Sequence, residues 1–572
     1  MSDTPSDASP RPRWPFVRGL PLAAPLRLHR PSDTWFKPAL SVVVASAVPH
    51  LTLLALGRLD LVMYTMAGSL CALYGHGLPY ARRARTVAGV VFSMAAGLAV
   101  ALVTASLTHS TAVLVAVGAL LAAAQKVACD AVRIGPPGHV ILTFVSSAAL
   151  FAPQRLGQVP AHLALTLGAG AVAWLVSVGP ALIRREGPER RAVARALEAA
   201  ADRLAEPGPR TRHTAAAAVH AAWQCLLASG RPTPVRRSLE RLVVHAEAAL
   251  VDPDRLRAWA ALTRARGPVP EPPPAPGTAA ELYGIDAERA ELRASGGRRA
   301  ARRTLLRSLG PGSHLLAVAA RTLIGCALAG YLCAALGVGR PYWAIVTAAS
   351  LYQANTTLTW NRTLQRTLGN LLGVLVFAAV LPLSRTGPLA LVLCCLFFSF
   401  AAEALITRNY WLGSVAVTPM ALLVLEFGGA HPAGELVGDR VLDTVLGALA
   451  GFLAAALVTN RRAAGRVERA LEAAARARTD AERAYADRAH AGPDGLDRAR
   501  RALTARLVEL REAADIAAGE WWQRALPEQE VVAAERAGHR TLAATAQRPG
   551  PPVRAPETRR GAVAPAPANG AA

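Results

Sequence analysis

The chain has 572 residues, of which 52% are hydrophobic and only 18% are charged. This composition, with a mean hydropathy of +0.28, excludes an ordinary soluble protein of this length, because the Ala, Leu and Val runs are longer than a globular core needs. The net charge of +24 comes almost entirely from arginine, since lysine occurs only at Lys37 and Lys126. The charge flanks apolar runs and no nucleic-acid-binding motif accompanies it, so we predict an integral membrane protein that binds no nucleic acid.

Twelve apolar segments follow one another in two groups of six. They lie near 39–56, 60–77, 86–107, 111–128, 139–152 and 160–183, and then near 315–336, 341–358, 367–381, 387–405, 410–427 and 440–459. Two of them, 139–152 and 367–381, are shorter than the ~20 residues that a span usually needs. The pattern predicts an all-α membrane protein with about twelve transmembrane helices in two tandem six-helix halves.

The distribution of arginine gives the orientation, because short cytoplasmic loops carry the excess of basic residues. Arginines precede the first span, occur at Arg82, Arg83 and Arg85 between the second and third spans, and follow the sixth span at Arg184 and Arg185. The bias in the second half has the same sign but is weaker. We therefore expect a multi-pass protein of the cell membrane with both termini in the cytoplasm.

The polar stretches between and after the two halves have the periodicity of amphipathic helices. Helices are expected at 187–205, 211–229, 234–250, 278–295, 461–489 and 494–525, and a basic amphipathic stretch at 298–309. The predicted organisation is a cytosolic basic arm (1–38), a first membrane half (39–183), a cytosolic helical region (184–313) with a Pro-rich linker (267–277), a second membrane half (314–460), a second cytosolic helical region (461–545) and a disordered tail (546–572).

The two halves resemble each other in sequence. The segment 67–89 aligns without a gap over 348–370, which places Arg85 on Arg366. Because six spans is an even number, both copies should have the same orientation, and a pseudo-twofold axis should run along the membrane normal.

The segment 339–373 carries the clearest motif. The pair Tyr342-Trp343 opens one span, and a polar loop followed by an Arg-Thr-x-Gly-x-x-x-Gly run, from Arg366 to Gly373, opens the next. This arrangement resembles the signature of the fusaric acid resistance and aromatic acid exporter family, in its two-half, twelve-span form. The resemblance implies export of aromatic or other organic carboxylates. The first half departs from the motif, with Ala88 and Phe92 in place of Gly369 and Gly373.

Candidate substrate-binding residues lie toward the predicted cytosolic side of the second half. They are Arg321, Asn355, Arg362, Arg366 and Glu403, with Arg85 as the counterpart of Arg366 in the first half. A planar guanidinium suits a carboxylate, so these residues could form a vestibule that attracts anions. The alternative is that the arginines serve topology and one of them pairs with Glu403. Tyr342, Trp343, Tyr410 and Trp411 begin spans, and we expect them to be interfacial belt residues, the alternative being stacking partners for an aromatic substrate. Asp443 is expected to pair with Arg440, the alternative being that it carries a proton.

We find no catalytic motif, no Walker lysine and no cysteine or histidine at metal-ligand spacing, so we expect neither an enzyme nor a metal or cofactor. Three functions are compatible with the sequence. The first is an exporter of small organic, in particular aromatic carboxylate, anions. The others are a gated anion channel and a membrane scaffold whose cytosolic helices bind a partner. The expected partners are an organic anion and the lipid bilayer, and a homo-oligomer is left open.

Overall fold

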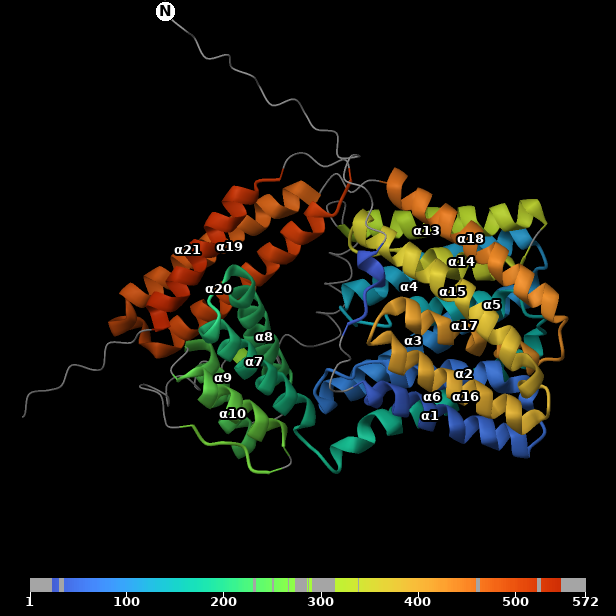
Figure 1. Cartoon of the computed structure of the whole chain (residues 1–572), viewed down its shortest axis with the longest axis horizontal. Coiled ribbons are helices and arrows are strands. Elements are labelled where there is room, and N and C mark those ends of the chain that lie inside the picture. The colour runs from blue at the N-terminus through green and yellow to red at the C-terminus, as the bar shows by residue number, and fades with distance from the viewer. Residues whose placement is uncertain are drawn as a thin grey trace, which may run out of the picture.

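The computed structural model describes residues 23–29, 35–229, 233–248, 251–265, 267–272, 285, 288–290, 314–337, 339–458, 463–521 and 526–546. All regular elements within these residues are helices. The all-α class predicted from the sequence is therefore confirmed. Figure 1 shows the apolar helices packed side by side in one bundle, with the polar helices gathered at one end of it.

The first membrane half contains six α-helices. They are α1 (Phe36–Ala55), α2 (Val62–Ser69), α3 (Tyr80–Leu107), α4 (Thr111–Ala131), α5 (Val140–Leu150) and α6 (Val159–Val178). Short 3-10 turns extend α2 on both sides, so that apolar helical structure runs over Leu59–Leu73.

The second membrane half repeats this order. Its helices are α13 (His314–Leu336), α14 (Pro341–Leu351), α15 (Thr356–Ser384), α16 (Pro388–Ile406), α17 (Tyr410–Glu426) and α18 (Ala433–Leu457). Across the described part of the chain, eight helices are long and apolar enough to cross a membrane, namely α1, α3, α4, α6, α13, α15, α16 and α18. The helices at the other four predicted spans, α2, α5, α14 and α17, are shorter, so the count of twelve crossings stays a prediction.

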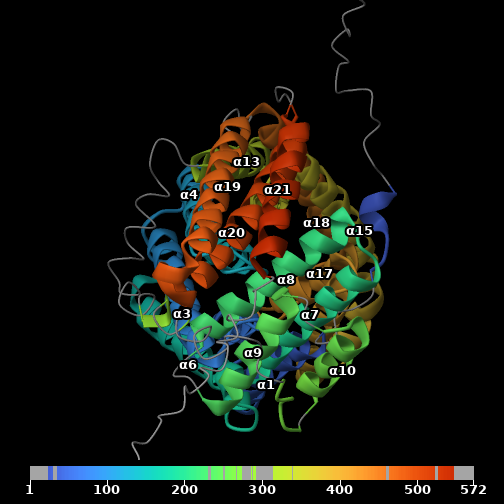
Figure 2. The same ribbon diagram turned by 90° about the vertical axis from the view of Figure 1, so that its left-hand side faces the viewer.

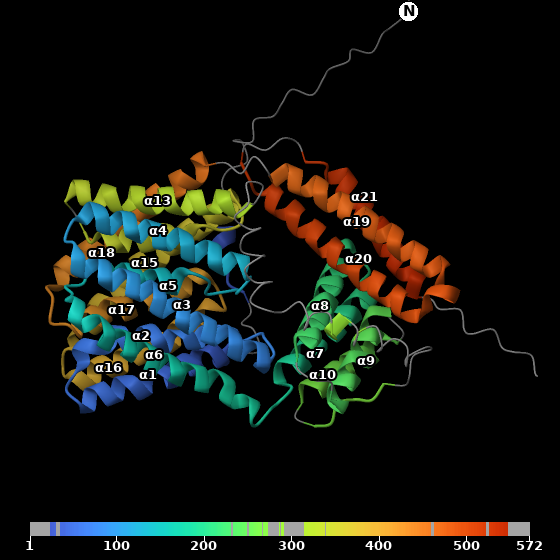
Figure 3. The same cartoon turned by 180° about the vertical axis from the view of Figure 1, so that it is seen from behind.

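The packing between helices follows the twofold relation that the sequence predicts. The first helix of each half packs on the fourth helix of the other half, α1 on α16 and α13 on α4. Within each half, the sixth helix packs on the first, second and third helices. Figure 3 shows α4 beside α13, although they belong to different halves. The two halves thus interlock.

The third helix of the second half begins earlier than predicted. The side chain of Asn355 accepts a hydrogen bond of 2.8 Å from the backbone N–H of Leu358, which satisfies one of the unpaired donors at a helix start. The helix α15 therefore begins at Thr356 and not near residue 367. As a result, Arg362 and Arg366 lie inside a helix and not in the polar loop that was expected there.

Glycine lets this helix approach its neighbour closely. A Cβ atom on Gly369 would come within 2.5 Å of the carbonyl oxygen of Trp411, and one on Gly373 within 2.6 Å of the Cβ of Thr418. Both contacts are on α17. The Gly-x-x-x-Gly spacing thus brings two helices together.

The polar helices form one layer at one end of the bundle. This polar layer consists of α7 (Gly187–Ala205), α8 (Pro209–Ala228), α9 (Pro234–Ala248), α10 (Pro253–Arg264), α19 (Ala463–Ala486), α20 (Arg488–Ala518) and α21 (Glu528–Ala546). Figure 2 looks onto this layer. The helices α10 and α21 were not predicted. The basic stretch 298–309, most of the expected helix 278–295 and nearly all of the tail lie outside the described residues.

The two parts of the polar layer contact each other, although the second membrane half separates them in sequence. Helix α20 packs on α8. Arg501 forms an ion pair of 3.0 Å with Glu288, and Arg500 forms one of 3.6 Å with Glu247. The amphipathic pattern predicted two helical regions that are separate in sequence. In the structure, apolar and charged side chains of the two regions contact each other.

Candidate functional site

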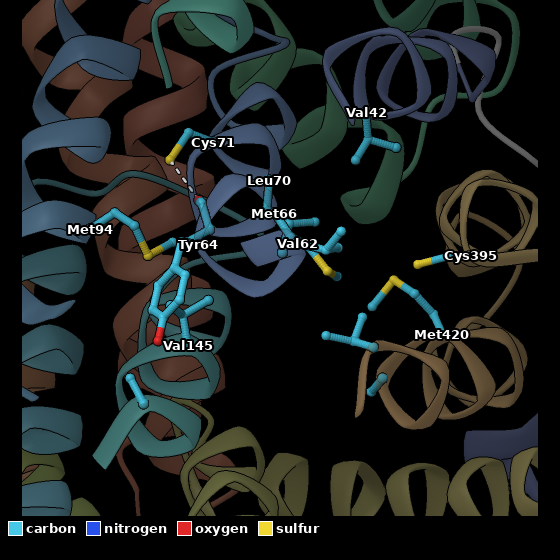
Figure 4. Close-up of a cluster of buried hydrophobic side chains, with 14 of the residues drawn as sticks. Val42, Val62, Tyr64, Met66, Leu70, Cys71, Met94, Val145, Cys395 and Met420 are labelled. Atoms are coloured by element: carbon cyan, nitrogen blue, oxygen red, sulfur yellow. Dashed lines mark hydrogen bonds between the residues drawn. The ribbon is translucent and has the colours of Figure 1, made fainter. Parts of the chain in front are cut away.

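A hydrophobic core connects the two membrane halves. Figure 4 shows Val62 and Met66 of α2 on one side of this core, and Cys395 of α16 and Met420 of α17 on the other. Between the halves lies a small pocket with a volume of about 20 Å³. Its lining comes from both halves and consists of Met63, Met66, Phe144, Val145, Ala148, Tyr342, Trp343, Ala421, Val424 and Leu425. We call it the interhalf pocket.

The expectation that Tyr342 and Trp343 are interfacial belt residues is wrong. Tyr342 is 6% exposed and Trp343 is 2% exposed. The ring of Trp343 lies 5.5 Å from that of Phe144 in the first half, centroid to centroid. The expectation assumed that residues at the start of a span lie at the membrane interface. Instead, neighbouring helices bury α14 on all sides, including Tyr342 and Trp343 near its start.

Arg362, Arg366 and Tyr410 form a cluster between α15 and α17, which we call the arginine–tyrosine cluster. Nη1 of Arg366 donates a hydrogen bond of 3.1 Å to the Tyr410 hydroxyl. The guanidinium of Arg362 lies 3.7 Å from the centroid of the Tyr410 ring, at a distance typical of a cation–π interaction. Arg366 is 5% exposed, and its Nε has no partner. No carboxylate forms an ion pair with either arginine within the described residues.

Arg321 is part of a different contact. Its guanidinium forms two hydrogen bonds, of 3.0 and 2.9 Å, with the carboxylate of Glu520, and Nε donates to the backbone oxygen of Val458. Both side chains are buried, at 2% and 1% exposure. Arg321 was expected to require a protein or water partner because of its depth. It has a carboxylate of the chain itself, so the predicted vestibule does not include it as a free cation.

Asn355 belongs to the same contact, because the residues that follow α20 pack against the start of α15. The side chain of Asn355 donates to the backbone oxygen of Asp515 at 3.4 Å. The backbone oxygen of Gly519 accepts hydrogen bonds from both the N–H and the hydroxyl of Thr357. The polar layer is thus fastened to the membrane domain at this point. Asn355 serves this contact and the helix cap.

The other two predicted site residues lie elsewhere. Glu403 is half-buried on α16 and forms no ion pair within the described residues, so the expected structural pair of an arginine with Glu403 is absent. Arg85 is exposed, and its Nε contacts only the backbone oxygen of Ala81. The buried arginine of the first half is Arg83, which contacts His76 at 3.1 Å. Arg85 thus does not share the buried environment of Arg366, its counterpart in the ungapped alignment.

Arg440 is a buried residue that the sequence analysis did not include among the candidate substrate-binding residues. It is 1% exposed, and its guanidinium lies 4.0 Å from the centroid of the Trp343 ring. The expected ion pair with Asp443 does not form. Asp443 accepts hydrogen bonds from the backbone N–H of Arg340 and from the thiol of Cys333. The spacing of three to four residues along α18 could have shown that Arg440 lies on the buried face of this helix. The buried residues at this spacing are Leu436, Arg440, Asp443 and Gly447.

Similarity to known proteins is strongest over the helices that form this site. Residues 322–454 match the family model described as "Fusaric acid resistance protein-like". The matched segment, 322–454, is thus similar to this family. It covers α14 to α17 completely and thus contains Arg362, Arg366, Tyr410, Trp343 and Arg440.

One curated relative is described as "Uncharacterized membrane protein YvaC" of Bacillus subtilis strain 168. It is 32% identical over 130 residues, which are 22% of this chain and 20% of the relative. The chain thus matches about a fifth of the relative's length. No solved structure matches the chain. Both similarities support a multi-pass membrane protein whose second half carries the family resemblance.

Proposed function

We propose that the protein exports small organic anions, in particular aromatic carboxylates, from the cytosol across the cell membrane. The observation that carries this proposal is the arginine–tyrosine cluster. Two arginines lie inside a membrane helix where no carboxylate of the described residues forms an ion pair with them, and Nε of Arg366 has no hydrogen-bond partner. Charged residues inside a membrane are costly and mark substrate paths. A planar guanidinium suits a carboxylate.

The family similarity supports efflux as the direction of transport. A membrane potential that is negative inside favours the exit of an anion by about 2.3 kcal/mol per charge per 100 mV. Facilitated efflux therefore needs no ATP-binding domain. Because the interhalf pocket is small, the two halves must move relative to each other before an organic anion can pass, which favours a carrier over the gated channel.

The test is flux from liposomes that contain the purified protein and are loaded with a panel of labelled weak organic acids. A potassium diffusion potential sets the sign of the voltage. We expect saturable, voltage-driven release of at least one acid, and no release of its neutral amide. Unitary currents would instead support the channel, and the absence of flux for every acid would favour the scaffold.

A further inference from the structure

Arg440 is a buried cation with no partner for its N–H groups. Its Nε, Nη1 and Nη2 atoms form no hydrogen bond with any described residue. The nearest carboxylate on its own helix, Asp443, has its oxygens engaged by Arg340 and Cys333. An unpaired guanidinium in a membrane helix costs several kcal/mol or more, so its retention calls for a function.

The surroundings of Arg440 suit one class of ligand. The guanidinium lies over the face of Trp343. Trp343 and Tyr342 also line the interhalf pocket, where the thioether chains of Met63 and Met66 face them from the first half. The side chain of Trp343 thus contacts both the interhalf pocket and the guanidinium of Arg440, which is not itself one of the residues that line the pocket.

Arg440 is also near the arginine–tyrosine cluster. Arg366, Tyr410 and the carboxylate of Asp443 are all close enough to Arg440 to interact with it electrostatically, although Asp443 forms no hydrogen bond with it. Arg366 lies ten residues after the start of α15 and Arg440 seven after the start of α18, about 15 and 10 Å along the two helices. These two helices begin at opposite ends of the bundle, so the two cations lie on either side of its middle.

We propose that Arg440 binds the carboxylate of an organic anion, with the apolar part of that anion held against Trp343 in the interhalf pocket. This assignment rests on the proposed export function and places the central binding site at the boundary between the halves. The guanidinium offers two parallel N–H groups that match the two oxygens of a carboxylate. The pocket volume of about 20 Å³ has room for about one water molecule. The flexible side chains of Met63 and Met66 must therefore move to admit the ligand.

The competing role for Arg440 is purely structural, as a cation that holds Trp343 in place. The two roles predict opposite effects on stability. If Arg440 is kept for binding, Arg440→Met removes a buried charge whose N–H groups have no hydrogen-bond partner among the described residues, and it should raise the Tm of the ligand-free protein. Arg321→Met is the matched control, because it removes a buried arginine that has a carboxylate partner, and it should lower the Tm.

The second measurement is binding of labelled benzoate to the full chain in lipid nanodiscs. We expect the Kd to rise at least about tenfold in Arg440→Met and less in Arg440→Lys, which restores the charge but not the planar fork. Trp343→Leu should weaken benzoate more than acetate. Arg385→Met should leave the Kd unchanged, because Arg385 lies at the end of α15 and pairs with Glu426 at 2.9 Å.

The assignment is overturned if Arg440→Met binds benzoate as tightly as the wild type, or if it lowers the Tm as much as Arg321→Met does. In either case the wild type can still export acids, and the proposed function stands. If the wild type neither binds benzoate nor releases any acid of the panel, the proposed function fails and the assignment fails with it.

Discussion

Arginine side chains inside the second membrane half differ in what compensates their charge. Arg321 has a buried carboxylate, Arg362 has an aromatic face, and Arg366 has a phenol hydroxyl. Arg440 has an aromatic face alone. A residue paired with a carboxylate is committed to structure, whereas one paired only with neutral groups can still attract an anion. The predicted vestibule therefore contains two kinds of arginine. Arg321 is paired with a carboxylate, whereas Arg362 and Arg366 are paired only with neutral groups.

The pair of Arg321 and Glu520 should stabilise the attachment of the polar layer. We expect Glu520→Gln to destabilise the protein by about 3–5 kcal/mol, because it leaves a buried arginine without its counter-charge. The double variant Arg321→Met/Glu520→Leu should lose much less. Thermal unfolding of Arg321→Met, Glu520→Leu and the double variant measures the coupling, and additive losses would contradict the pairing.

The depth of Arg321 could be predicted from its position in an apolar run, and so could its need for a partner. The partner itself could not, because Glu520 lies 199 residues further along the chain. The burial of Trp343 was also missed, since a Tyr-Trp pair at the start of a span has the same sequence pattern whether lipid or protein surrounds it.

At the scale of elements, the contact between α15 and α17 depends on the absence of side chains at two positions. Replacing Gly369 with leucine should cost about 1–3 kcal/mol or more, because the backbone and Cβ atoms of α17 would have to move. Gly89→Leu on α3 is the control, since no atom lies within 4 Å of the position of its Cβ. Folded yield and Tm should fall for Gly369→Leu alone, and an equal loss in both variants would refute the close-packing account.

The packing of α21 in the polar layer should weaken in acid. Burial, reinforced by Arg212 and Arg203, lowers the pKa of His539 from 6.5 to about 4. The folded state therefore prefers neutral His539, and stability falls as the pH drops from about 6.5 toward 4. At pH 5 the loss amounts to about 2 kcal/mol at most.

Hydrogen exchange of the α21 amides in the full chain measures this effect. Protection should fall between about pH 7.5 and pH 5, and His539→Gln should reduce that fall. The exposed His109 offers a control, because its replacement by glutamine should leave the pH dependence as in the wild type. A pH dependence that is the same with and without His539 would rule out this residue as its source.

The periodicity of apolar residues located most ends of the long helices to within a few residues, although α3, α18 and α20 begin six or seven residues before the predicted segments. It failed at the start of α15, where the N-cap of Asn355 carries the helix through a polar segment. It also missed α10 and α21, since their amphipathic patterns are short or interrupted by alanine, and their apolar faces are defined only by the helices they cover.

At the scale of the whole molecule, two interlocked membrane halves carry one polar layer at one end. The duplication could be predicted from the repeat, but the exchange of contacts between α1 and α16, and between α13 and α4, could not. Helix contacts in lipid depend on shape complementarity more than on hydrophobicity, which varies little along these segments. The contact between the two polar regions could not be predicted either, because the amphipathic pattern of each region does not show which helices its apolar faces cover.

The orientation predicted from arginine can be tested by labelling. Single cysteines at Ser110 and Thr386, which lie at the end of the bundle away from the polar layer, should react with a membrane-impermeant maleimide added to intact cells. Cysteines at Gly267 and Glu530, in the polar layer, should react only after lysis. The seven native cysteines are buried in the structure, so their background should be low. Labelling at Gly267 in intact cells would reverse the orientation.

The central claim is that uncompensated arginines of the second half attract and orient an exported organic anion. The most direct measurement is efflux per inserted molecule for the wild type, Arg366→Gln and Arg366→Lys, with the inserted amount quantified separately. We predict that Arg366→Gln inserts normally and loses at least about tenfold in efflux, with partial recovery in Arg366→Lys. Undiminished efflux per molecule in Arg366→Gln would contradict the account.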